Sequence, residues 1–495
     1  MKSMDRRSFI KTSALASASL GLLPTLGRSQ PANARVRGAN EDIRVAVVGF
    51  GGRGKDHIKG FGELQGVRLV ALCDVDKHIL EREVKRCADA GKPVQSYTDI
   101  RKLLENNEVD LVSIATPNHW HSLAAIWSMQ AGKDVYVEKP VSHNVWEGRQ
   151  VVNAARKYNK MCQTGTQSRS SREGIAQMVE WVKAGNLGKI LIARGQCYKP
   201  RGSIGKTEGP QTVPDYIDYD LWCGPAPLTP PRRNNPKFGP IHYDWHWFWA
   251  YGCGDLGNQG IHQMDIARWF TGENALSPRV CSVGGRLGYV DDAETPNTQI
   301  VYHDYARAPL IFEVRGLPEK TGASNMDKFP AKNGGSVCVN IHCEGGLVHV
   351  PNYTGATAYD KDGKKIVEFK GSESHYENLI KAVRSRKVSD LHADILEGHL
   401  SSALCHTGNV SYRIGRQKSP DEIREALKSD STALEAFGRM AEHLAANGVD
   451  LDKTQATLGE VLKMDPKTER FIGSSKANEL LTREYRMPFV VPVKV

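Results

Sequence analysis

The sequence predicts an α/β fold whose first domain is a doubly wound parallel sheet, and three observations lead to this prediction. Short runs rich in Val, Ile, Leu and Ala recur at residues 44–49, 67–74, 109–117 and 133–140. Segments with a helical pattern lie between them, at residues 56–64, 78–90, 100–106 and 122–131. A glycine-rich turn follows the first run. Near-continuous apolar runs are typical of strands that helices cover on both faces, as in a parallel sheet.

The glycine-rich turn indicates that this domain binds a dinucleotide. Between the first predicted strand and the first predicted helix stand Gly49, Phe50, Gly51, Gly52, Arg53 and Gly54. Glycines at such positions let backbone N–H groups approach a pyrophosphate at a helix N-terminus. Asp74 ends the second run, where a carboxylate accepts hydrogen bonds from a ribose diol and repels a 2′-phosphate. The pattern favours NAD over NADP, and a phosphate contact from Arg53 leaves NADP open.

Two further strand ends supply candidate residues at the same edge of the sheet. The loop after the third run places polar and turn-forming residues where nicotinamide and its ribose would lie, namely Thr116, Pro117, Asn118 and His121. The fourth run ends in Glu138 and Lys139, before Pro140. A Glu–Lys pair is often only a surface ion pair. At the carboxyl edge of a dinucleotide-binding sheet, the pair is a candidate for cofactor binding and, for Lys139, for catalysis.

Four motifs in a fixed order extend this interpretation. They are GFGGRG at 49–54, ATPNHWH at 115–121, EKP at 138–140 and GDLGNQGIHQMDIARW at 254–269. With them the sequence resembles the glucose-fructose oxidoreductase and inositol dehydrogenase (Gfo/Idh/MocA) family of NAD(P)-dependent enzymes, over roughly residues 41–415. The resemblance implies a second, α+β domain with a large, open, mostly antiparallel sheet that often packs against a second subunit. We therefore expect a homo-oligomer, either a dimer or a tetramer.

The second part of the chain is consistent with such a sheet. Strand-like runs separated by Gly, Pro and Asp occur at residues 190–197, 279–286, 298–302, 310–315, 336–342 and 347–350. Between the first two lies a long Pro- and Trp-rich passage, residues 198–251. Aromatic faces suit the C–H faces of sugars, although most of these aromatics are expected to tie the loop to the core. The predicted substrate-binding residues of this passage are Arg201, Tyr243, Trp245 and His246.

The motif at 254–269 supplies the second half of the predicted active site. A helix beginning near Asn258 would place Asn258 and His262 on one face. The resemblance implies an acid and a histidine four residues apart, and here Asn258 stands at the acid position. His262 is then the expected base, with Lys139 hydrogen-bonded to the reacting oxygen and Asn258 holding the substrate or His262. Substrate contacts are expected from Asn258 and His262 as well.

The whole chain divides into four predicted parts. A signal peptide at 1–34 precedes the NAD-binding domain at 35–165, the substrate and oligomerisation domain at 166–415, and a helical extension with an extended tail at 416–495. Helices are expected at 375–384 and 392–413, and then in the extension at 421–427, 431–446, 458–464 and 477–483.

The N-terminus resembles a twin-arginine export signal and predicts a periplasmic protein. Arg6 and Arg7 precede a mildly apolar stretch and the small-residue site at 32–34. That stretch is too short and too weakly apolar for a membrane span, so no stable insertion of the mature chain is expected. Part of the net charge of +10 lies in this segment, and no basic run with interleaved aromatics argues for nucleic acid. The ten cysteines lack CxxC pairs, so buried thiols are expected and no metal.

Together these features predict an exported NAD-dependent oxidoreductase that acts on a hydroxyl of a carbohydrate or glycoside. Free nicotinamide cofactor is scarce outside the cytoplasm, so the cofactor is expected to stay bound and to be recycled in place. An NAD-dependent glycosidase is the alternative: transient oxidation acidifies the neighbouring C–H, and elimination then cleaves the glycosidic bond. A third hypothesis is a sugar-binding protein that has lost turnover. The presence of Asn258 in place of the family's acid slightly favours it.

Overall fold

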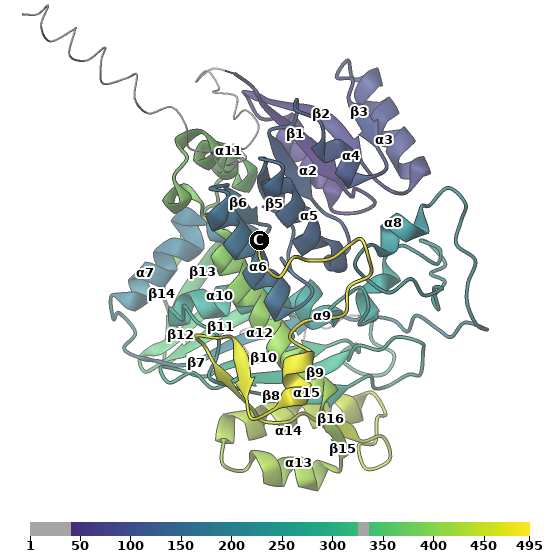
Figure 1. Cartoon of the computed structure of the whole chain (residues 1–495). Coiled ribbons are helices and arrows are strands. Elements are labelled where there is room, and N and C mark those ends of the chain that lie inside the picture. The colour runs from purple at the N-terminus through teal and green to yellow at the C-terminus, as the bar shows by residue number, and fades with distance from the viewer. Residues whose placement is uncertain (1–40, 325–335) are drawn as a thin grey trace, which may run out of the picture. The chain divides into compact units, whose positions relative to one another are not determined.

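The computed structural model describes residues 41–324 and 336–495 (Figure 1). The predicted signal peptide at 1–34 lies outside the described residues. Within the described residues, the strands form one sheet of six strands and one of twelve. No helix in this part of the chain is long and apolar enough to cross a bilayer. All ten cysteines fall within it and are buried, and none of them forms a disulfide there.

The first sheet confirms the predicted doubly wound domain. Its strands run parallel in the order β3-β2-β1-β4-β5-β6. Their bounds are β1 Ile43–Val48, β2 Val67–Cys73, β3 Gln95–Tyr97, β4 Leu111–Ile114, β5 Asp134–Val137 and β6 Cys162–Thr164. Every residue of β1, β4 and β5 is buried, as the unbroken apolar runs required.

Helices cover both faces of this sheet. One face packs against α2 (Gly54–Gly62), α3 (Lys77–Asp89) and, from late in the chain, α11 (His375–Ser385). The other face packs against α4 (Ile100–Leu104), α5 (Asn118–Gln130) and α6 (Val145–Lys157). The helix expected from residue 122 begins four residues earlier, because Pro117 in an extended conformation starts α5 directly after the loop. Asn118 and His121 therefore lie on the first turn of α5.

The second sheet is mostly antiparallel, as the family resemblance implied. Its order is β14-β13-β12-β11-β7-β10-β9-β8-β16-β15, with β17 beside β8 and β18 beside β17. Only β7 and β10 pair in parallel among these described strands. The bounds are β7 Ile190–Tyr198, β8 Arg279–Gly285, β9 Thr298–His303, β10 Leu310–Arg315, β11 Val337–Cys343, β12 Gly346–Val350, β13 Gly355–Asp360, β14 Lys365–Lys370, β15 Arg416–Lys418, β16 Ala456–Leu458, β17 Leu462–Asp465 and β18 Arg470–Ile472.

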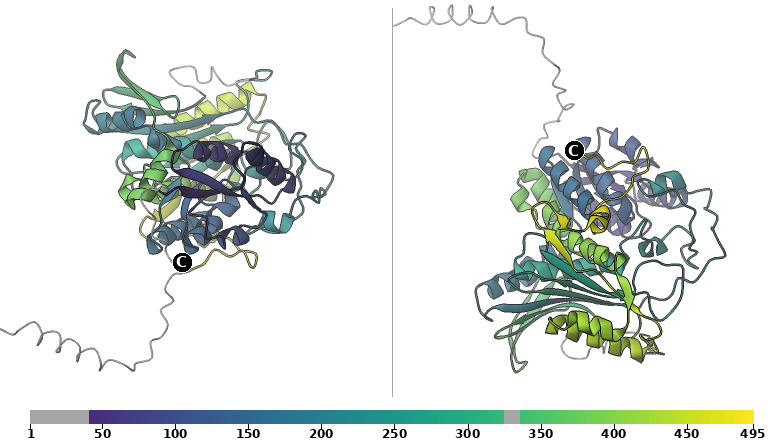
Figure 2. Two further views of the ribbon diagram at one scale, coloured as in Figure 1. Left: turned by 90° about the horizontal axis from the view of Figure 1, so that it is seen from above. Right: turned by 60° about the horizontal axis from the view of Figure 1, so that its bottom comes forward.

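Each face of the second sheet carries its own helices (Figure 2). On the side of the first domain, α10 (Gly260–Thr271) and α12 (Ile395–Arg413) pack on the sheet in the largest hydrophobic cluster of the described residues. On the opposite side, α13 (Pro420–Leu427) and α14 (Ser431–Ala446) cover the strands around β8, β9 and β10. The remaining short helices are η1 Gln167–Ser170, η2 Arg172–Ala176, α7 Gln177–Lys183, α8 Tyr219–Cys223, η3 Asp244–Trp247, α9 Gly254–Asn258, η4 Val388–Asp390 and α15 Ser475–Glu479.

The C-terminal extension is less helical than predicted. The helices expected at 421–427 and 431–446 are confirmed as α13 and α14, whereas the helix expected at 458–464 is wrong. That segment forms β16 and β17, which join the sheet at β8. In β17, Leu462 and Met464 are buried and Lys463 between them is exposed, an alternation of period two. The helix expected at 477–483 is the single short turn of α15.

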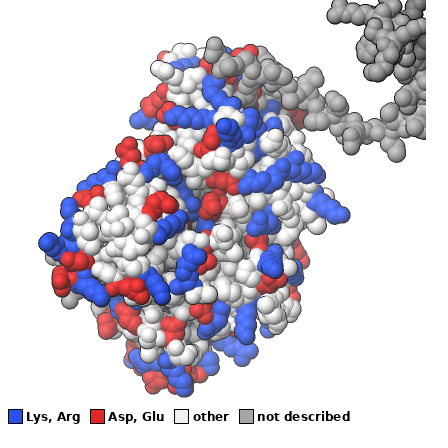
Figure 3. Space-filling model, turned by 90° about the vertical axis from the view of Figure 1, so that its left-hand side faces the viewer, with Lys and Arg blue, Asp and Glu red and all other residues white. Residues whose placement is uncertain are grey.

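The surface is not dominated by one sign of charge on the face seen in Figure 3. Lys and Arg side chains are interspersed there with Asp and Glu. Some oppositely charged side chains pair within one helix, for example Arg424 with Asp421 on α13 and Lys381 with Glu377 on α11.

Candidate active site

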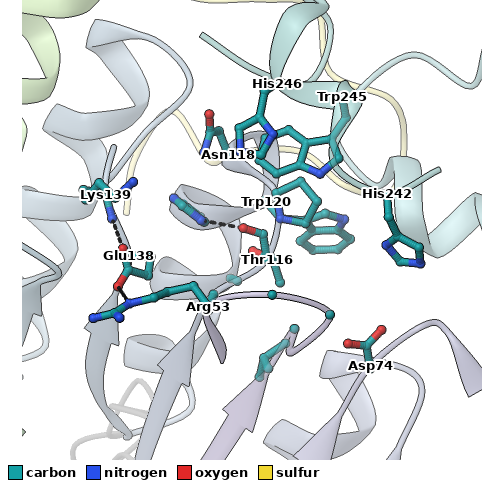
Figure 4. A pocket seen from close by; sticks show the side chains of 18 of the residues that line it. Arg53, Asp74, Thr116, Asn118, Trp120, Glu138, Lys139, His242, Trp245 and His246 are labelled. Atoms are coloured by element: carbon teal, nitrogen blue, oxygen red, sulfur yellow. Dashed lines mark hydrogen bonds and ion pairs between the residues drawn. The ribbon is translucent and has the colours of Figure 1, made fainter. Parts of the chain in front are cut away.

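A cavity of about 860 Å³ lies at the carboxyl ends of the parallel strands and is lined by residues of both domains (Figure 4). It collects sixteen of the residues that the sequence singled out: Gly49, Gly51, Gly52, Arg53, Asp74, Thr116, Pro117, Asn118, His121, Glu138, Lys139, Tyr243, Trp245, His246, Asn258 and His262. Segments more than 200 residues apart in the chain therefore meet around one space. Phe50, Gly54 and Arg201 are not among the lining residues.

The glycine-rich turn closes tightly at the first strand end. Gly49 has a φ of +77°, and a Cβ there would lie 2.8 Å from Thr116 Cα. A Cβ at Gly54, the first residue of α2, would lie 2.1 Å from the Gly49 carbonyl oxygen. Any side chain at either position would push the turn open. Gly54 therefore shapes the turn from behind, while Gly51 and Gly52 line the cavity.

Asp74 is fixed at the end of β2 by two backbone amides. Its Oδ2 accepts from the Phe50 N–H at 2.9 Å and its Oδ1 from the Asp76 N–H at 3.0 Å. The Phe50 side chain is fully buried in the core, so Phe50 serves the site through its backbone only. Burial raises the pKa of Asp74, although the two amide hydrogen bonds oppose this shift. The carboxylate oxygens keep further lone pairs for a ligand hydroxyl.

The loop between β4 and α5 offers polar atoms that have no partner in the protein. Thr116 Oγ1 and Asn118 Oδ1 are buried, and neither atom has a hydrogen-bond partner within the described residues. Such buried atoms are costly unless a ligand or water pairs with them. His121 has a structural role, because its Nδ1 lies 2.6 Å from the Pro140 carbonyl oxygen and its Nε2 lies 2.8 Å from the Thr116 carbonyl oxygen.

Lys139 extends from the end of β5 and is held by the second domain. Its Nζ donates to the Asn258 backbone carbonyl at 2.8 Å. Burial lowers the pKa of Lys139, and the neighbouring Glu138 carboxylate opposes that shift. An amine in this environment gives up a proton more readily than one in water.

Glu138 lies in a buried network that the sequence analysis missed. Its carboxylate is 3.1 Å from His57 Nε2 on α2 and 3.3 Å from Arg53 Nε. His57 Nδ1 in turn lies 2.9 Å from Ser113 Oγ on β4. Burial alone raises the pKa of Glu138, but His57, Lys139 and Arg53 outweigh burial and lower it, so the group stays a carboxylate. No local pattern marks His57, because its partners are 56 and 81 residues away.

His262 and Asn258 both line the cavity, although not on one continuous helix. The helix expected from Asn258 is broken: α9 ends at Asn258 and α10 begins at Gly260. His262 Nδ1 is buried without a hydrogen-bond partner in the described residues, and its ring packs 4.8 Å from that of Tyr353. Burial, with Lys139 next in effect, lowers the pKa of His262 to about 3. Asp265 points away from the cavity and pairs with Arg169 at 2.8 Å.

The Pro- and Trp-rich passage supplies the roof of the cavity. Figure 4 shows Trp245 and His246 above the cavity, across from Arg53 and Asp74. Their rings stack with centroids 3.7 Å apart. Arg201 lies behind this wall: it binds Asp255 through two hydrogen bonds of 2.9 and 3.0 Å and donates to the Tyr243 hydroxyl at 2.9 Å. Arg201 thus positions Tyr243 and does not itself face the cavity.

The same passage also closes the end of the cavity near Asp74, which the sequence analysis did not anticipate. Ile217 forms a β-bridge with Asp76, and Tyr216 stacks on His78 at 3.9 Å. His242 Nε2 lies 2.9 Å from Asp76 Oδ2. Residues 216–242, which we call the strap, add Leu221, Trp222, Phe238 and His242 to the lining.

Comparison with known proteins identifies this arrangement. Residues 43–166 match the model of an oxidoreductase family with an NAD-binding Rossmann fold, and residues 178–321 match the C-terminal α/β domain of the same family. The chain belongs to the Gfo/Idh/MocA oxidoreductase family. The Rossmann domain is thus an NAD-binding domain, and the glycine turn, Asp74 and the unpartnered atoms of Thr116 and Asn118 fit that cofactor.

Curated relatives of this Gfo/Idh/MocA protein include two described as glycosyl hydrolase family 109 proteins. The chain is 31% identical to that of Shewanella pealeana over 204 residues, which is 38% of this chain and 44% of the relative. It is 30% identical to that of Shewanella baltica over 208 residues, 39% of this chain and 45% of the relative. The chain therefore spans less than half the length of these relatives.

Solved structures share the fold over most of the chain. The WlbA dehydrogenase of Bordetella pertussis, solved with NADH and UDP-GlcNAcA, is 22% identical with a TM-score of 0.53, and the match covers 74% of this chain and 94% of WlbA. An oxidoreductase domain protein of Kribbella flavida is 19% identical with a TM-score of 0.53, over 74% of this chain and 96% of that protein. At these identities the likeness shows the fold.

Proposed function

We propose that this protein is an NAD-dependent oxidoreductase that acts on a CH–OH group of a carbohydrate or glycoside. The observation that carries the proposal is the meeting of Lys139 and His262 in the cavity that the glycine turn of the Rossmann domain opens into. The aromatic and hydroxyl-bearing side chains that line the same cavity, among them Trp245, Tyr243 and Tyr353, suit a sugar ring. Binding of sugar substrates by related dehydrogenases such as WlbA is in line with this.

The roles of the residues follow from their surroundings. NAD, when bound, accepts a hydride from a carbinol carbon and can return it. In the proposal, Lys139 donates a hydrogen bond to the reacting oxygen, because its Nζ is fixed by the Asn258 carbonyl. His262 is neutral at physiological pH and takes the hydroxyl proton. Glu138, paired with His57 and Arg53, keeps a fixed negative charge beside Lys139.

A screen of sugars and glycosides tests the proposal directly. The purified protein, loaded with NAD, is mixed with each compound while the absorbance and fluorescence of NADH are followed. Appearance of a NADH signal with at least one sugar, and of the keto product by mass spectrometry, is expected. A protein that binds NAD and yields no NADH with any carbohydrate would contradict it.

A second candidate is an NAD-dependent glycosidase that uses the same parts. The similarity to proteins described as glycosyl hydrolase family 109 favours it, although it extends over only part of each chain. His246, which lines the cavity together with His262, favours it as well because it could accept a second proton. The screen separates the two activities: release of free sugar without accumulation of NADH indicates cleavage, and a keto product indicates net oxidation.

We propose further that the cofactor is retained and that the protein is exported to the periplasm. The strap supports retention, because it covers the Asp74 end of the cavity through the Asp76–His242 pair. Export rests on the twin-arginine pattern around Arg6 and Arg7. Replacing both arginines with lysine while following the location of the protein tests export, and NAD in the purified periplasmic protein tests retention.

A homo-oligomer also remains a proposal, with a constraint on its interface. The part of the second sheet around β8, β9 and β10 is covered by α13 and α14 of the same chain. A second copy would therefore have to contact another surface. Light scattering of the purified protein gives the number of subunits.

A further inference from the structure

One ring nitrogen of His246 is hydrogen-bonded to the protein backbone, and the other is available to a ligand. Its Nδ1 is hydrogen-bonded to the Tyr243 backbone carbonyl, which can only accept, so Nδ1 carries the proton. Nε2 is then a lone-pair acceptor, and it has no hydrogen-bond partner in residues 41–324 and 336–495. The ring lines the cavity and is fixed in its plane by the stacked Trp245.

The backbone that presents His246 is strained. Tyr243 has φ 66° and ψ −61°, and the Asp244 N–H donates to the His242 carbonyl at 2.9 Å. These values describe a γ-turn with positive φ, which is rare for a residue with a side chain. Such strain persists only where surrounding structure holds it, and it concentrates at functional sites.

Three contacts hold the strained turn. Arg201, locked on Asp255, donates to the Tyr243 hydroxyl. Asn235 donates to both oxygens of the buried Asp244 carboxylate at 3.0 Å. Gly252 packs on the His246 backbone so closely that a Cβ would lie 2.5 Å from the His246 carbonyl oxygen. The position of His246 is thus set by residues that do not face the cavity.

The cavity therefore contains one more proton acceptor than the oxidation of an alcohol needs. Lys139 and His262 suffice for the hydroxyl proton. Burial, with Lys139 as the leading charge, lowers the pKa of His246 to about 3, so it too is neutral at physiological pH. A second neutral imidazole at a preset angle suits a second proton transfer on the same substrate.

We infer that His246 takes a proton from the ring carbon next to an oxidised carbon of the sugar, so that the site can carry out elimination of a glycosidic substituent. This rests on the proposed function, because the substrate must present a carbonyl. The Nε2 lone pair accepts the proton, and the C–H electron pair becomes that of an enolate. As the enolate collapses, the bond from the next carbon to the leaving oxygen breaks. That oxygen takes a proton from water, and the His246 imidazolium returns its proton to water, which restores the neutral base. An unsaturated ketone and an alcohol result, with no net change in oxidation state.

Exchange of hydrogen in deuterium oxide tests this step without any hydride transfer. A methyl glycoside that already carries a ring ketone is incubated with the NAD-loaded protein in D2O, and the C–H next to the carbonyl is followed by NMR. The wild-type protein is expected to exchange this hydrogen and to release methanol. His246→Asn keeps a donor for the Tyr243 carbonyl but lacks Nε2. Its rate of hydrogen exchange should be lower than that of the wild-type protein by at least ~100-fold.

Two measurements keep the outcomes distinct. NAD binding by His246→Asn, followed by fluorescence, shows whether the variant is folded, and His349→Gln, on β12 and outside the cavity, is the matched histidine control. Exchange by His246→Asn at the wild-type rate, or no exchange by the wild-type protein, overturns the inference. If the wild-type protein exchanges the ketone but forms no NADH from any sugar, the inference stands and the proposed oxidation fails.

Discussion

The Nζ of Lys139 lies 2.8 Å from the backbone carbonyl oxygen of Asn258. This carbonyl is available because α9 ends at Asn258, and the last carbonyls of a helix have no partner within it. The hydrogen bond at the break between α9 and α10 thus links the two domains at the cavity. It gives Asn258 a role that depends on its backbone, and the residue also lines the cavity.

Replacing Lys139 with methionine is expected to lower the rate of NADH formation by ~10²–10⁴-fold, the usual contribution of a positioned proton donor. The apolar chain fills the same volume and removes only the amine. Single-turnover fluorescence of NADH measures the step. Lys463→Met, at an exposed position on β17 outside the cavity, should react at the wild-type rate. Equal rates for both variants would show that Lys139 takes no part.

Replacing Asn258 with aspartate should move the pH dependence of the reaction. His262 has a pKa of about 3 and is a neutral base above that pH. A carboxylate in the same cavity favours the imidazolium and raises this pKa, so His262 becomes protonated at a higher pH. The rate of NADH formation in the variant should therefore start to fall at a higher pH than in the wild type. Superimposable pH profiles would argue against His262 as the base.

Part of this site could be predicted from the sequence because some of its residues stand in recognisable local sequence patterns. The glycine turn, Asp74 and Lys139 each stand at the end of an apolar run, where a parallel sheet collects its ligands. Contacts between distant segments have no such pattern. His57 reaches Glu138 across 81 residues and His242 reaches Asp76 across 166, so neither contact could be predicted.

Two features of the structure differ from what the sequence suggested, for different physical reasons. Arg201 was assigned to the substrate because its chemistry suits a sugar, but the nearby buried Asp255 binds its guanidinium first. The segment 458–464 was assigned to a helix, yet Gly459 packs against Ser282 and Ser411 and only an extended chain can pair with β8 there. In both cases a tertiary partner decided the outcome.

Replacing Asp74 with alanine should weaken NAD more than NADP. The carboxylate is expected to accept hydrogen bonds from the ribose diol, and bonds to charged groups contribute ~1.5–3 kcal/mol. NAD affinity should fall ~10–100-fold, while loss of the negative charge removes a repulsion toward a 2′-phosphate. Titrations of the cofactor-free protein with both nucleotides give the ratio. Equal weakening of the two would mean that Asp74 only shapes the turn.

Removing the His242 side chain should release NAD faster. His242→Ala breaks the pair with Asp76 that holds the strap, and we expect the dissociation rate to rise ~10-fold, the value of one such hydrogen bond. A chase of bound NAD measures the rate. Arg232→Ala, an exposed change on the same segment, is the control. An unchanged rate would show that the strap does not limit release.

The same pair predicts how retention depends on pH. Burial raises the pKa of Asp76, but hydrogen bonds from His242 and the Ile79 amide outweigh burial and lower it. A lowered folded pKa means that the stabilisation is present above the ordinary pKa of Asp and is lost as the pH falls through the folded value. NAD release should therefore quicken in acid below about pH 4.

Truncating Phe437 on α14 should destabilise the protein strongly. Its side chain is fully buried between α14 and the second sheet, in the cluster that includes Ile300, Ile311 and Met440. Phe437→Ala leaves a cavity at that interface, and such changes cost ~3–5 kcal/mol in the free energy of unfolding. Urea unfolding followed by fluorescence measures the loss, with the exposed Glu442→Ala on the same helix as control. A loss below 1 kcal/mol would mean that α13 and α14 are not part of the folding unit, and the sheet face beneath them would then be open to a second subunit.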